Sequence, residues 1–409
     1  MPKTRWFALP FLLLALFAFA PAAQACGGFF CTNVPVDQAA ERIIFAVNDG
    51  DGTIDAYVQI NYQGAPDAFA WVVPVPNTPK LDVATMPMLR DLDRLTQPLF
   101  IAPPLDDTCR NRLPVLLSGA VPVPQSAQGG VTVFDQGSVG PFNYSVIGSD
   151  DPQALINWLR ENKYQITPPM EPLVGVYVKE KMQFLAMKLQ PNKQVRDIQP
   201  IKMTYKAVQP MIPLRLTAVA ATPNMVVLTW ILSRTQAEPQ NYAAVKVSDS
   251  DIVFTGFGGN NYSALVSQRL TDYKGRAFIT EFAGPTSGLT ASDPDLRGLL
   301  ARYPYLTRVF TRISPEEMTV DPVFKFNPSL PDISNVHDLS KDSSRVWECQ
   351  GRTVSNHTAG PVEATVIRAT DSYNPIVMAI YGAGVCVALA LAFVGVALVL
   401  VRRSANRPA

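Results

Sequence analysis

Two cysteines near the N-terminus form the most reactive short motif of the chain, in the stretch CGGFFC from Cys26 to Cys31. Thiol oxidoreductases place two cysteines two residues apart at a helix N-terminus, which lowers the pKa of the attacking thiol. Here four residues separate the cysteines, and the following Val34-Pro35 predicts no helix. The two glycines supply the backbone freedom that a small disulfide ring needs. We therefore interpret the motif as a structural disulfide, with a thiol-redox site as the alternative.

The remaining cysteines agree with an exported protein. Cys386 lies in an apolar run, which leaves Cys26, Cys31, Cys109 and Cys349 as an even set. Disulfides are common in exported proteins, so two are expected, and four cysteines allow three connectivities. We favour Cys26 with Cys31 and Cys109 with Cys349, because the second pair would tie a proline-rich loop to the end of the folded region.

The stretch NDGDGTID resembles a cation-binding loop, with Asp49, Asp51 and Asp55 spaced around Gly52. If Gly52 is aligned with the glycine of a calcium loop, however, valines occupy the first and last ligand positions. A hairpin turn uses the same aspartates and glycines for its backbone geometry. We therefore predict a turn here, keep the three aspartates as metal candidates of second choice, and expect no cofactor.

Motifs of common enzyme classes are missing. The two histidines, His337 and His357, form neither an i, i+4 pair nor a zinc-like cluster with cysteine. The chain has no Gly-x-Ser-x-Gly elbow, no Ser-x-x-Lys and no phosphate-binding Gly-Lys-Ser/Thr loop. The sequence therefore indicates no catalytic residue.

The N-terminus has the three parts of a secretory signal peptide. The basic residues Lys3 and Arg5 precede an apolar run, and small residues follow up to Ala25. This order predicts a signal peptide over residues 1–25. Cys26 would then be the first mature residue, but the stretch before it lacks the leucine of lipoprotein signals, so a lipid anchor is the less favoured alternative.

A second apolar segment predicts a transmembrane helix over residues 375–401. Its uncharged run of 26 residues, Ile376 to Val401, is long enough to cross a bilayer core of about 30 Å. Arginines follow in residues 402–409, so the positive-inside rule places this tail in the cytoplasm. The sequence predicts a single-pass type I protein of the cell membrane, with the membrane as one partner and the ectodomain outside the cytoplasm.

Residues 26–350 remain for the extracytoplasmic domain, and residues 351–374 for a juxtamembrane linker. This length fits one large domain or two lobes. The formal net charge is +1, and no long basic run precedes the tail, so binding to nucleic acid is not expected.

Hydrophobic periodicity predicts an α+β domain, rich in antiparallel strands and with a few short helices. Trp71 lies on an alternating strand and is expected in the core, and strand pairs that lead to Trp71 and Trp230 suggest two related lobes. Strands are expected to dominate residues 173–247. The predicted elements are hairpins over 43–60 and 131–147; helices over 82–95, 150–166 and 261–273; strands over 68–76, 184–190, 214–221, 225–234 and 277–284; and two short helices within 293–318, the second beginning at Ser314.

Several segments spread along the chain share their motifs and spacing with one known family. They are the start ACGGFFC, the hairpin IIFAVNDGDGTIDAYVQINY, and the segments ALINWLRENKYQI, YLTRVFTRISPEEMTVDPVF and WECQGR. Together they resemble the bacterial family called domain of unknown function 2330, over most of the ectodomain. The resemblance implies an exported bacterial protein, often with a single C-terminal anchor, and implies no activity or catalytic residue.

These observations favour a membrane-anchored, non-enzymatic binding or scaffolding module of the cell envelope. We expect its partner to be an envelope protein or a glycan. The alternative is an envelope enzyme, a hydrolase or a thiol-redox protein, whose site no linear motif reveals.

Overall fold

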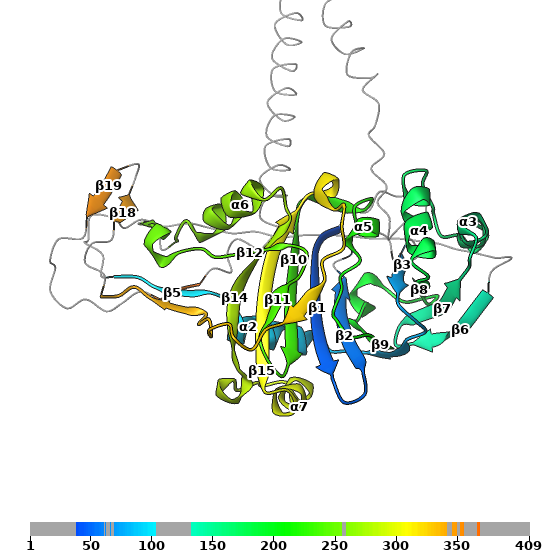
Figure 1. Ribbon diagram of the computed structural model, residues 1–409, viewed down its shortest axis with the longest axis horizontal. Coiled ribbons are helices and arrows are strands. Elements are labelled where there is room, and N and C mark those ends of the chain that lie inside the picture. The colour runs from blue at the N-terminus through cyan, green and yellow to red at the C-terminus, as the bar shows by residue number, and fades with distance from the viewer. Residues whose placement is uncertain are drawn as a thin grey trace, which may run out of the picture.

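The computed structural model describes residues 38–60, 62, 66, 69–103, 132–255, 259–341, 346–349, 352–355 and 366–368. These residues form a mixed α+β structure in which strands predominate, sheets are mostly antiparallel and six short α-helices occur (Figure 1). The predicted fold class is confirmed for this part of the chain.

An eight-stranded sheet forms the centre of the molecule. Its inner strands β1 and β10 run parallel, as do β12 and β14, and its other neighbours are antiparallel. Its strands, in spatial order, are β12 (Ala243–Val245), β14 (Ala277–Pro285), β15 (Tyr305–Ile313), β10 (Ala221–Ser233), β1 (Gln38–Asn48), β2 (Thr53–Ile60), β9 (Ile201–Lys206) and β4 (Lys80–Val83).

Both faces of this sheet are covered, as the sequence of β1 shows. Ile43 and Phe45 lie on one face and Ile44 and Ala46 on the other, because successive side chains alternate across a strand. All four are at most 2% exposed. A strand with two buried faces requires a layer on each side of the sheet.

A four-stranded antiparallel sheet packs on the first of these faces. Its strands, in spatial order, are β3 (Ala70–Val75), β8 (Gln183–Leu189), β7 (Phe142–Gly148) and β6 (Thr132–Val139). Trp71 and Val73 of β3 share one hydrophobic cluster with Ile43 and Phe45 of β1. Trp71 is 2% exposed, which confirms its predicted place in the core.

Two helices cover the outer face of the four-stranded sheet, α3 (Pro152–Glu161) and α4 (Met170–Lys179). Tyr177 of α4 packs edge-on against Phe184 of β8, with ring centroids 6.3 Å apart. Figure 1 shows both helices beside β7 and β8, at the end of the molecule away from β14.

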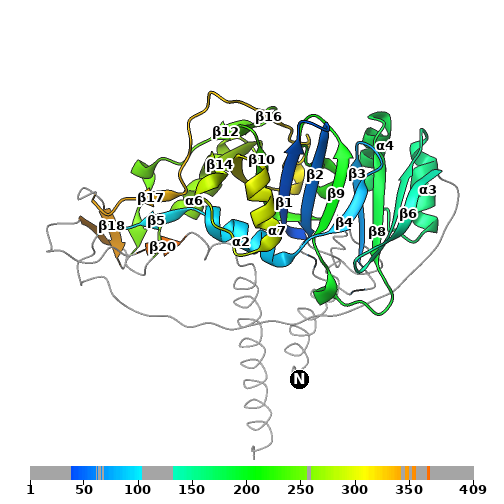
Figure 2. The same cartoon turned by 90° about the horizontal axis from the view of Figure 1, so that it is seen from below.

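Three other helices cover the opposite face of the large sheet: α2 (Met86–Thr96), α6 (Tyr262–Asp272) and α7 (Pro294–Arg302). Their apolar residues join Ile44, Trp230 and Phe310 in a second hydrophobic cluster. Figure 2 shows α2 and α7 in front of strands β1 and β10. The order of layers is therefore helix, sheet, sheet, helix.

Three small sheets complete the fold. Their strands are β11 (Ala237–Pro239) with β16 (Phe324–Phe326); β17 (Val336–Asp338), β5 (Leu99–Ile101) and β20 (Val366–Arg368); and β13 (Phe254–Thr255), β18 (Val346–Cys349) and β19 (Arg352–Ser355).

Polar side chains begin three of the helices, each with a proline in its first turn. Thr85 caps α2, Asp151 caps α3 and Asp293 caps α7, and each side chain accepts a backbone N–H of the first turn. The helix predicted over residues 150–166 is confirmed, and it begins after its cap Asp151.

The predicted strand over residues 214–221 is wrong. Residues Leu214–Thr217 form the one-turn helix α5, and β10 begins at Ala221 and includes residues 222–224, which lie between the two predicted strands. Leu214 and Leu216 are both fully buried. A single helical turn enclosed by the core can bury the same alternate residues as a strand, so periodicity does not separate the two. The backbone of β10 is irregular near its start, because Asn224 has a φ of 58°.

One further expectation needs correction. Strands do not dominate the whole of residues 173–247, since most of α4 lies there with Val174, Tyr177 and Val178 buried at helical spacing.

The two short helices predicted within residues 293–318 are confirmed. The first is α7, and the second is the 3-10 helix Pro315–Glu317, which begins with a capping box at Ser314. The central strand β15 lies between them.

Among the described residues, no helix is both long and apolar enough to cross a membrane. The predicted signal peptide (1–25), transmembrane helix (375–401) and cytoplasmic tail (402–409) lie outside the described residues and stay predictions.

Candidate functional site

A cavity of about 110 Å³ lies between the two sheets. Strands β1, β2 and β9 form its wall on the large sheet, β3 forms the facing wall, and the segment after β9 closes a third side. The lining residues are Glu41, Ile43, Phe45, Ala56, Val58, Trp71, Val73, Pro74, Val75, Pro76, Met203, Tyr205, Ala207, Gln209, Met211 and Pro213.

Strand alternation directs Glu41 into this cavity. Glu41, Ile43 and Phe45 occupy every second position of β1, so they share the face that packs against the four-stranded sheet. Arg42 points to the other face, where its guanidinium lies 3.5 Å from Asp93. A carboxyl group therefore occupies a position that the rest of the strand fills with apolar side chains.

Glu41 is 8% exposed, and its Oε2 is fully buried with no hydrogen-bond partner among the described residues. Burial in apolar surroundings penalises the charged form and raises the pKa of Glu41 to about 7. Because a buried polar atom without a partner costs free energy, this carboxyl does not serve stability.

The rest of the lining is mostly aromatic and aliphatic. Phe45, Trp71 and Tyr205 contribute aromatic surface. Besides Glu41, the described lining has polar groups in the side chain of Gln209, the phenol of Tyr205 and the indole N–H of Trp71. Burial raises the pKa of Tyr205 above its usual range, so the phenol stays neutral.

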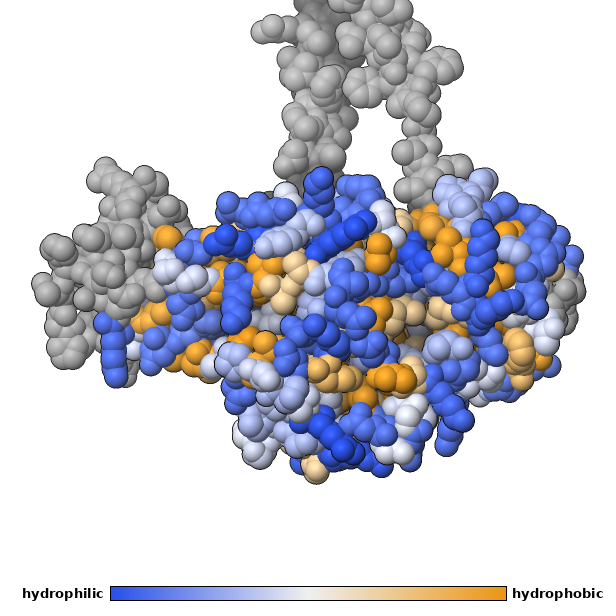
Figure 3. All heavy atoms as spheres, viewed as in Figure 1, coloured by the Kyte–Doolittle hydropathy of each residue, from blue (hydrophilic) through white to orange (hydrophobic). Residues whose placement is uncertain are grey.

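The outer surface differs from the cavity lining. On the face seen in Figure 3, hydrophilic residues predominate and hydrophobic residues form several separate areas.

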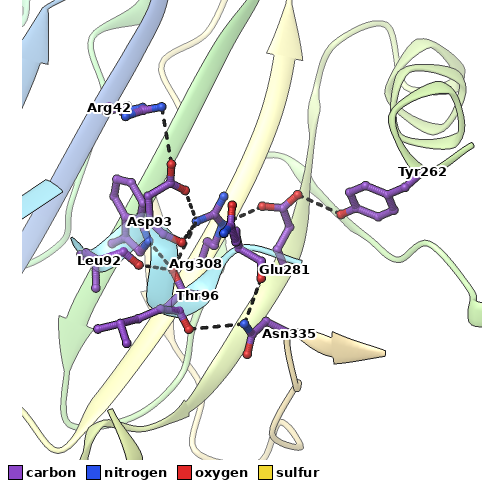
Figure 4. A network of polar contacts seen from close by, with 11 residues as sticks. Arg42, Leu92, Asp93, Thr96, Tyr262, Glu281, Arg308 and Asn335 are labelled. Atoms are coloured by element: carbon purple, nitrogen blue, oxygen red, sulfur yellow. Dashed lines mark hydrogen bonds and ion pairs between the residues drawn. The ribbon is translucent and has the colours of Figure 1, made fainter. Parts of the chain in front are cut away.

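A second candidate, a network of buried polar groups, lies on the opposite face of the large sheet (Figure 4). Arg308 of β15 is 1% exposed, and its Nε lies 2.7 Å from Oε2 of Glu281 on β14. Its Nη1 lies 2.6 Å from Oδ1 of Asp93 on α2. Tyr262 of α6 donates to the other oxygen of Glu281 at 2.9 Å.

The network continues through Thr96 at the end of α2. Its hydroxyl accepts from the indole N–H of Trp230 at 2.9 Å and donates to the carbonyl of Leu92 at 2.7 Å. The guanidinium of Arg308 lies over the Trp230 ring, 5.4 Å from its centroid. These charges are paired and hydrogen-bonded, and they join α2 and α6 to the sheet, so we assign the network a structural role.

The three aspartates of the predicted turn do not converge on one point. The turn itself is confirmed, since β1 and β2 pair antiparallel and Gly52 has a φ of 62°. Asp49 pairs with Arg234 at 2.9 Å, and Asp55 accepts from Thr204 at 2.6 Å and pairs with Lys202 at 3.1 Å. Asp51 is exposed at the turn.

Within the described part of the chain, no group of three His, Cys, Asp or Glu side chains could hold a metal ion. His337 stacks on Phe100 and pairs with Asp249 at 2.6 Å, while His357 lies outside the described residues. Of the cysteines, Cys26, Cys31 and Cys109 also lie outside them, and Cys349 is described only by its backbone in β18. The disulfide pairing therefore stays a prediction.

Comparison with known families places these features in a wider group. The family model described as "Uncharacterized protein conserved in bacteria (DUF2330)" matches residues 20–325. The chain belongs to this family. Neither the curated proteins nor the solved structures contain a match to the chain.

In this DUF2330 protein, the sequence pattern alone did not single out Glu41. The sequence did contain a signal for its burial. Glu41 and the apolar residues Ile43, Phe45 and Val47 occupy alternate positions of β1, so they point to the same face. An acid at an inward position of a strand can equally mark the point where burial ends. Only the packing of β3 against β1 distinguishes a buried carboxyl from an exposed strand end.

Proposed function

We propose that this protein is a membrane-anchored protein of the cell envelope whose α+β domain binds a small ligand in the cavity between its sheets. The observation that supports this most is the buried carboxyl of Glu41, whose Oε2 has no hydrogen-bond partner among the described residues, in a mostly apolar cavity. Ligand sites combine apolar walls with a few convergent polar groups. A ligand that binds Glu41 would explain why the chain keeps a buried carboxyl that costs stability when the site is empty.

The proposed location rests on the two ends of the sequence. The charged, apolar and small-residue order of residues 1–25 supports export, and the uncharged run of residues 376–401 before three arginines supports a single anchor.

Binding is favoured over catalysis by what surrounds Glu41. Hydrolysis by carboxyl groups uses two of them, one acid and one base or nucleophile. Among the described residues that line the cavity, Glu41 is the only carboxyl, and none is a Ser, Thr, Cys, His or Lys. The second candidate, an envelope enzyme, gains support from one observation, since a pKa of about 7 suits Glu41 to general acid–base chemistry.

Two methionine methyl groups can report occupancy of the cavity by NMR. Met203 and Met211 line it, whereas Met88 is buried in the cluster on the other face of the large sheet. The full-length chain, labelled with ¹³C at its methionine methyls and held in lipid nanodiscs, is titrated with short alkyl compounds that carry different head groups. At least one compound should shift Met203 and Met211 and leave Met88 unchanged.

Filling the cavity supplies the control. Ala56 is 1% exposed and lines it, so Ala56→Leu should abolish the shifts of the two lining methionines. Ala301→Leu makes the same change at an exposed position of α7 and should leave them intact. Absence of shifts with every compound, or equal shifts in Ala56→Leu, would refute the binding proposal. Substrate turnover that Glu41→Gln abolishes would establish the enzyme instead.

A further inference from the structure

Among the described residues that line the cavity, Glu41 is the only carboxylic acid and none is a base. The titratable groups can be followed strand by strand. Strand β1 contributes Glu41, and β2 contributes no titratable group, since its lining residues are Ala56 and Val58. The β3 wall has no titratable group, β9 adds the neutral phenol of Tyr205, and residues 207–213 add none to the described lining. A negative charge on Glu41 would therefore meet no compensating positive charge from the protein within the cavity.

Aromatic side chains come from three different strands of the wall. Phe45 lies on β1, Trp71 on β3 and Tyr205 on β9. These rings supply apolar surface against which the hydrocarbon part of a ligand would pack.

The lining extends along the strands away from Glu41. Glu41 pairs with Ile60 of β2, and Tyr205 of β9 pairs with Ile54 of the same strand. These two positions of β2 are six residue steps apart, which corresponds to about 20 Å. A ligand with a charged end and an apolar end matches this arrangement better than a compact polar molecule does.

We infer that the ligand is an organic cation, an amine bearing an alkyl or aromatic group, whose ammonium binds Glu41 and whose apolar part lies between the two sheets. This inference rests on the proposed function and specifies its ligand class. The ammonium would donate to Oε2 of Glu41, which is buried and has no hydrogen-bond partner among the described residues.

Other head groups satisfy the cavity less well. A fatty acid or a phosphate would bring a second negative charge beside Glu41, and no lysine, arginine or histidine is present in the described lining to neutralise it. A neutral alcohol would supply a hydrogen bond but leave the ionised carboxyl without a counter-charge. Only a cation both donates to Oε2 and neutralises Glu41.

The inference predicts a defined pH dependence. Glu41 must be ionised to pair with an ammonium, and its pKa is about 7 before ligand binds. An alkyl ammonium stays protonated in this range, since its pKa resembles that of lysine at about 10.4. Affinity should therefore fall by about tenfold between pH 8 and pH 6, as Glu41 takes up a proton.

The test compares three probes of equal chain length: n-hexylamine, n-hexanol and n-hexanoate. Affinities are measured by calorimetry and by the Met203 methyl shift, on the full-length chain in nanodiscs, with protein-free nanodiscs as the blank. Hexylamine should bind at least tenfold more tightly than hexanol at pH 8, and hexanoate should bind more weakly than either.

Two variants assign the effect to Glu41. Glu41→Gln should lower hexylamine affinity at least tenfold at pH 8, remove its pH dependence, and change hexanol affinity less than twofold. Glu316→Gln makes the same chemical change at an exposed residue outside the cavity and should behave as the wild type. Both variants are checked for folding by their methionine spectra in the absence of probe.

The outcomes separate this inference from the proposal on which it rests. If hexanol or hexanoate shifts Met203 at least as strongly as hexylamine does, the cavity is a ligand site and the amine inference is wrong. Hexylamine binding that is unchanged by Glu41→Gln also overturns the inference. If no probe binds, both proposals fail together.

Discussion

Arg308 and Glu281 form an ion pair that is buried from both sides, with Nε and Oε2 2.7 Å apart and side chains 1% and 0% exposed. The two residues lie on neighbouring strands, β15 and β14, and face the helices α2 and α6. Desolvating both charges is costly, and the hydrogen bonds from Tyr262 to Glu281 and from Arg308 to Asp93 offset that cost.

The first prediction concerns this pair. Glu281→Gln keeps the shape of the side chain but leaves the guanidinium of Arg308 without its main counter-charge. Removing one partner of a buried ion pair destabilises a protein by about 3 kcal/mol or more. We expect a loss of this size in the free energy of unfolding, measured with urea and followed by circular dichroism.

An exposed pair provides the matched control for Glu281→Gln. Asp150 and Lys181 are 2.6 Å apart, but their side chains are 87% and 74% exposed. Asp150→Asn should therefore change the free energy of unfolding far less than Glu281→Gln does. Equal effects of the two substitutions would show that the Arg308 network does not have the structural role that we assign to it.

The second prediction is a pH-dependent effect of Glu41 on stability in the absence of ligand. The folded state holds the proton of Glu41 up to a pKa of about 7, whereas the pKa of an exposed glutamate is 4.5. Between these two values the folded state binds more protons than the unfolded state, so stability should decrease as pH rises from about 4.5 to 7. The loss amounts to about 3 kcal/mol at 1.36 kcal/mol per pKa unit.

Glu41→Gln removes this dependence, because an amide does not ionise. The variant should be more stable than the wild type by about 3 kcal/mol at pH 8, and the difference should nearly vanish at pH 4. Urea unfolding of both proteins at the two pH values measures it. A stability difference that is the same at pH 4 and pH 8 would contradict the pKa of Glu41 on which the prediction rests.

Local features of the fold were predictable from the sequence. The hairpin of β1 and β2 follows from alternating apolar residues around a Gly/Asp turn, and the start of α3 follows from Asp151 and Pro152. Both signals act within a few residues of the chain. By contrast, the parallel pairing of β1 with β10 joins Ile44 to Trp230, and no local signal specifies such a distant partner.

The candidate site was the harder part for the same reason. Its walls come from β1 and from β3, which belong to different sheets, and the sequence predicts each strand but not that the two sheets stack. Glu41 gains its properties from that stacking, since the apolar residues of both walls desolvate it. The motifs that sequence analysis did single out, CGGFFC and NDGDGTID, contribute no residue to the described lining.

The third prediction tests the orientation in the membrane. Ala359→Cys and Ser404→Cys are introduced one at a time into a Cys386→Ala background, on either side of the predicted span. Spheroplasts are then treated with a membrane-impermeant maleimide. The thiol at position 359 should react and the thiol at 404 should react only after the membrane is permeabilised. The reverse pattern would overturn the predicted type I orientation.

The fourth prediction concerns the junction of α2 and α7. The carboxyl of Asp91, which is 7% exposed, accepts the backbone N–H groups of Ser292 and Asp293 just before α7 begins. Asp293 in turn caps α7 and accepts from Thr85, the cap of α2. Because of these bonds, each helix start is held by a residue of the other.

Asp91→Asn tests this arrangement. The substitution replaces a charged acceptor by a neutral amide, whose N–H group can face the backbone N–H groups of Ser292 and Asp293 and cannot accept from them. We therefore expect the free energy of unfolding to fall by about 2 kcal/mol. The cap of α7 should loosen as well, and hydrogen exchange at Asp295 and Leu296, whose N–H groups bond to Asp293, should accelerate. Exchange at Gln153, which Asp151 caps in α3, serves as the internal control and should not change. Faster exchange at all three amides would indicate a general loss of stability and contradict a local junction between α2 and α7.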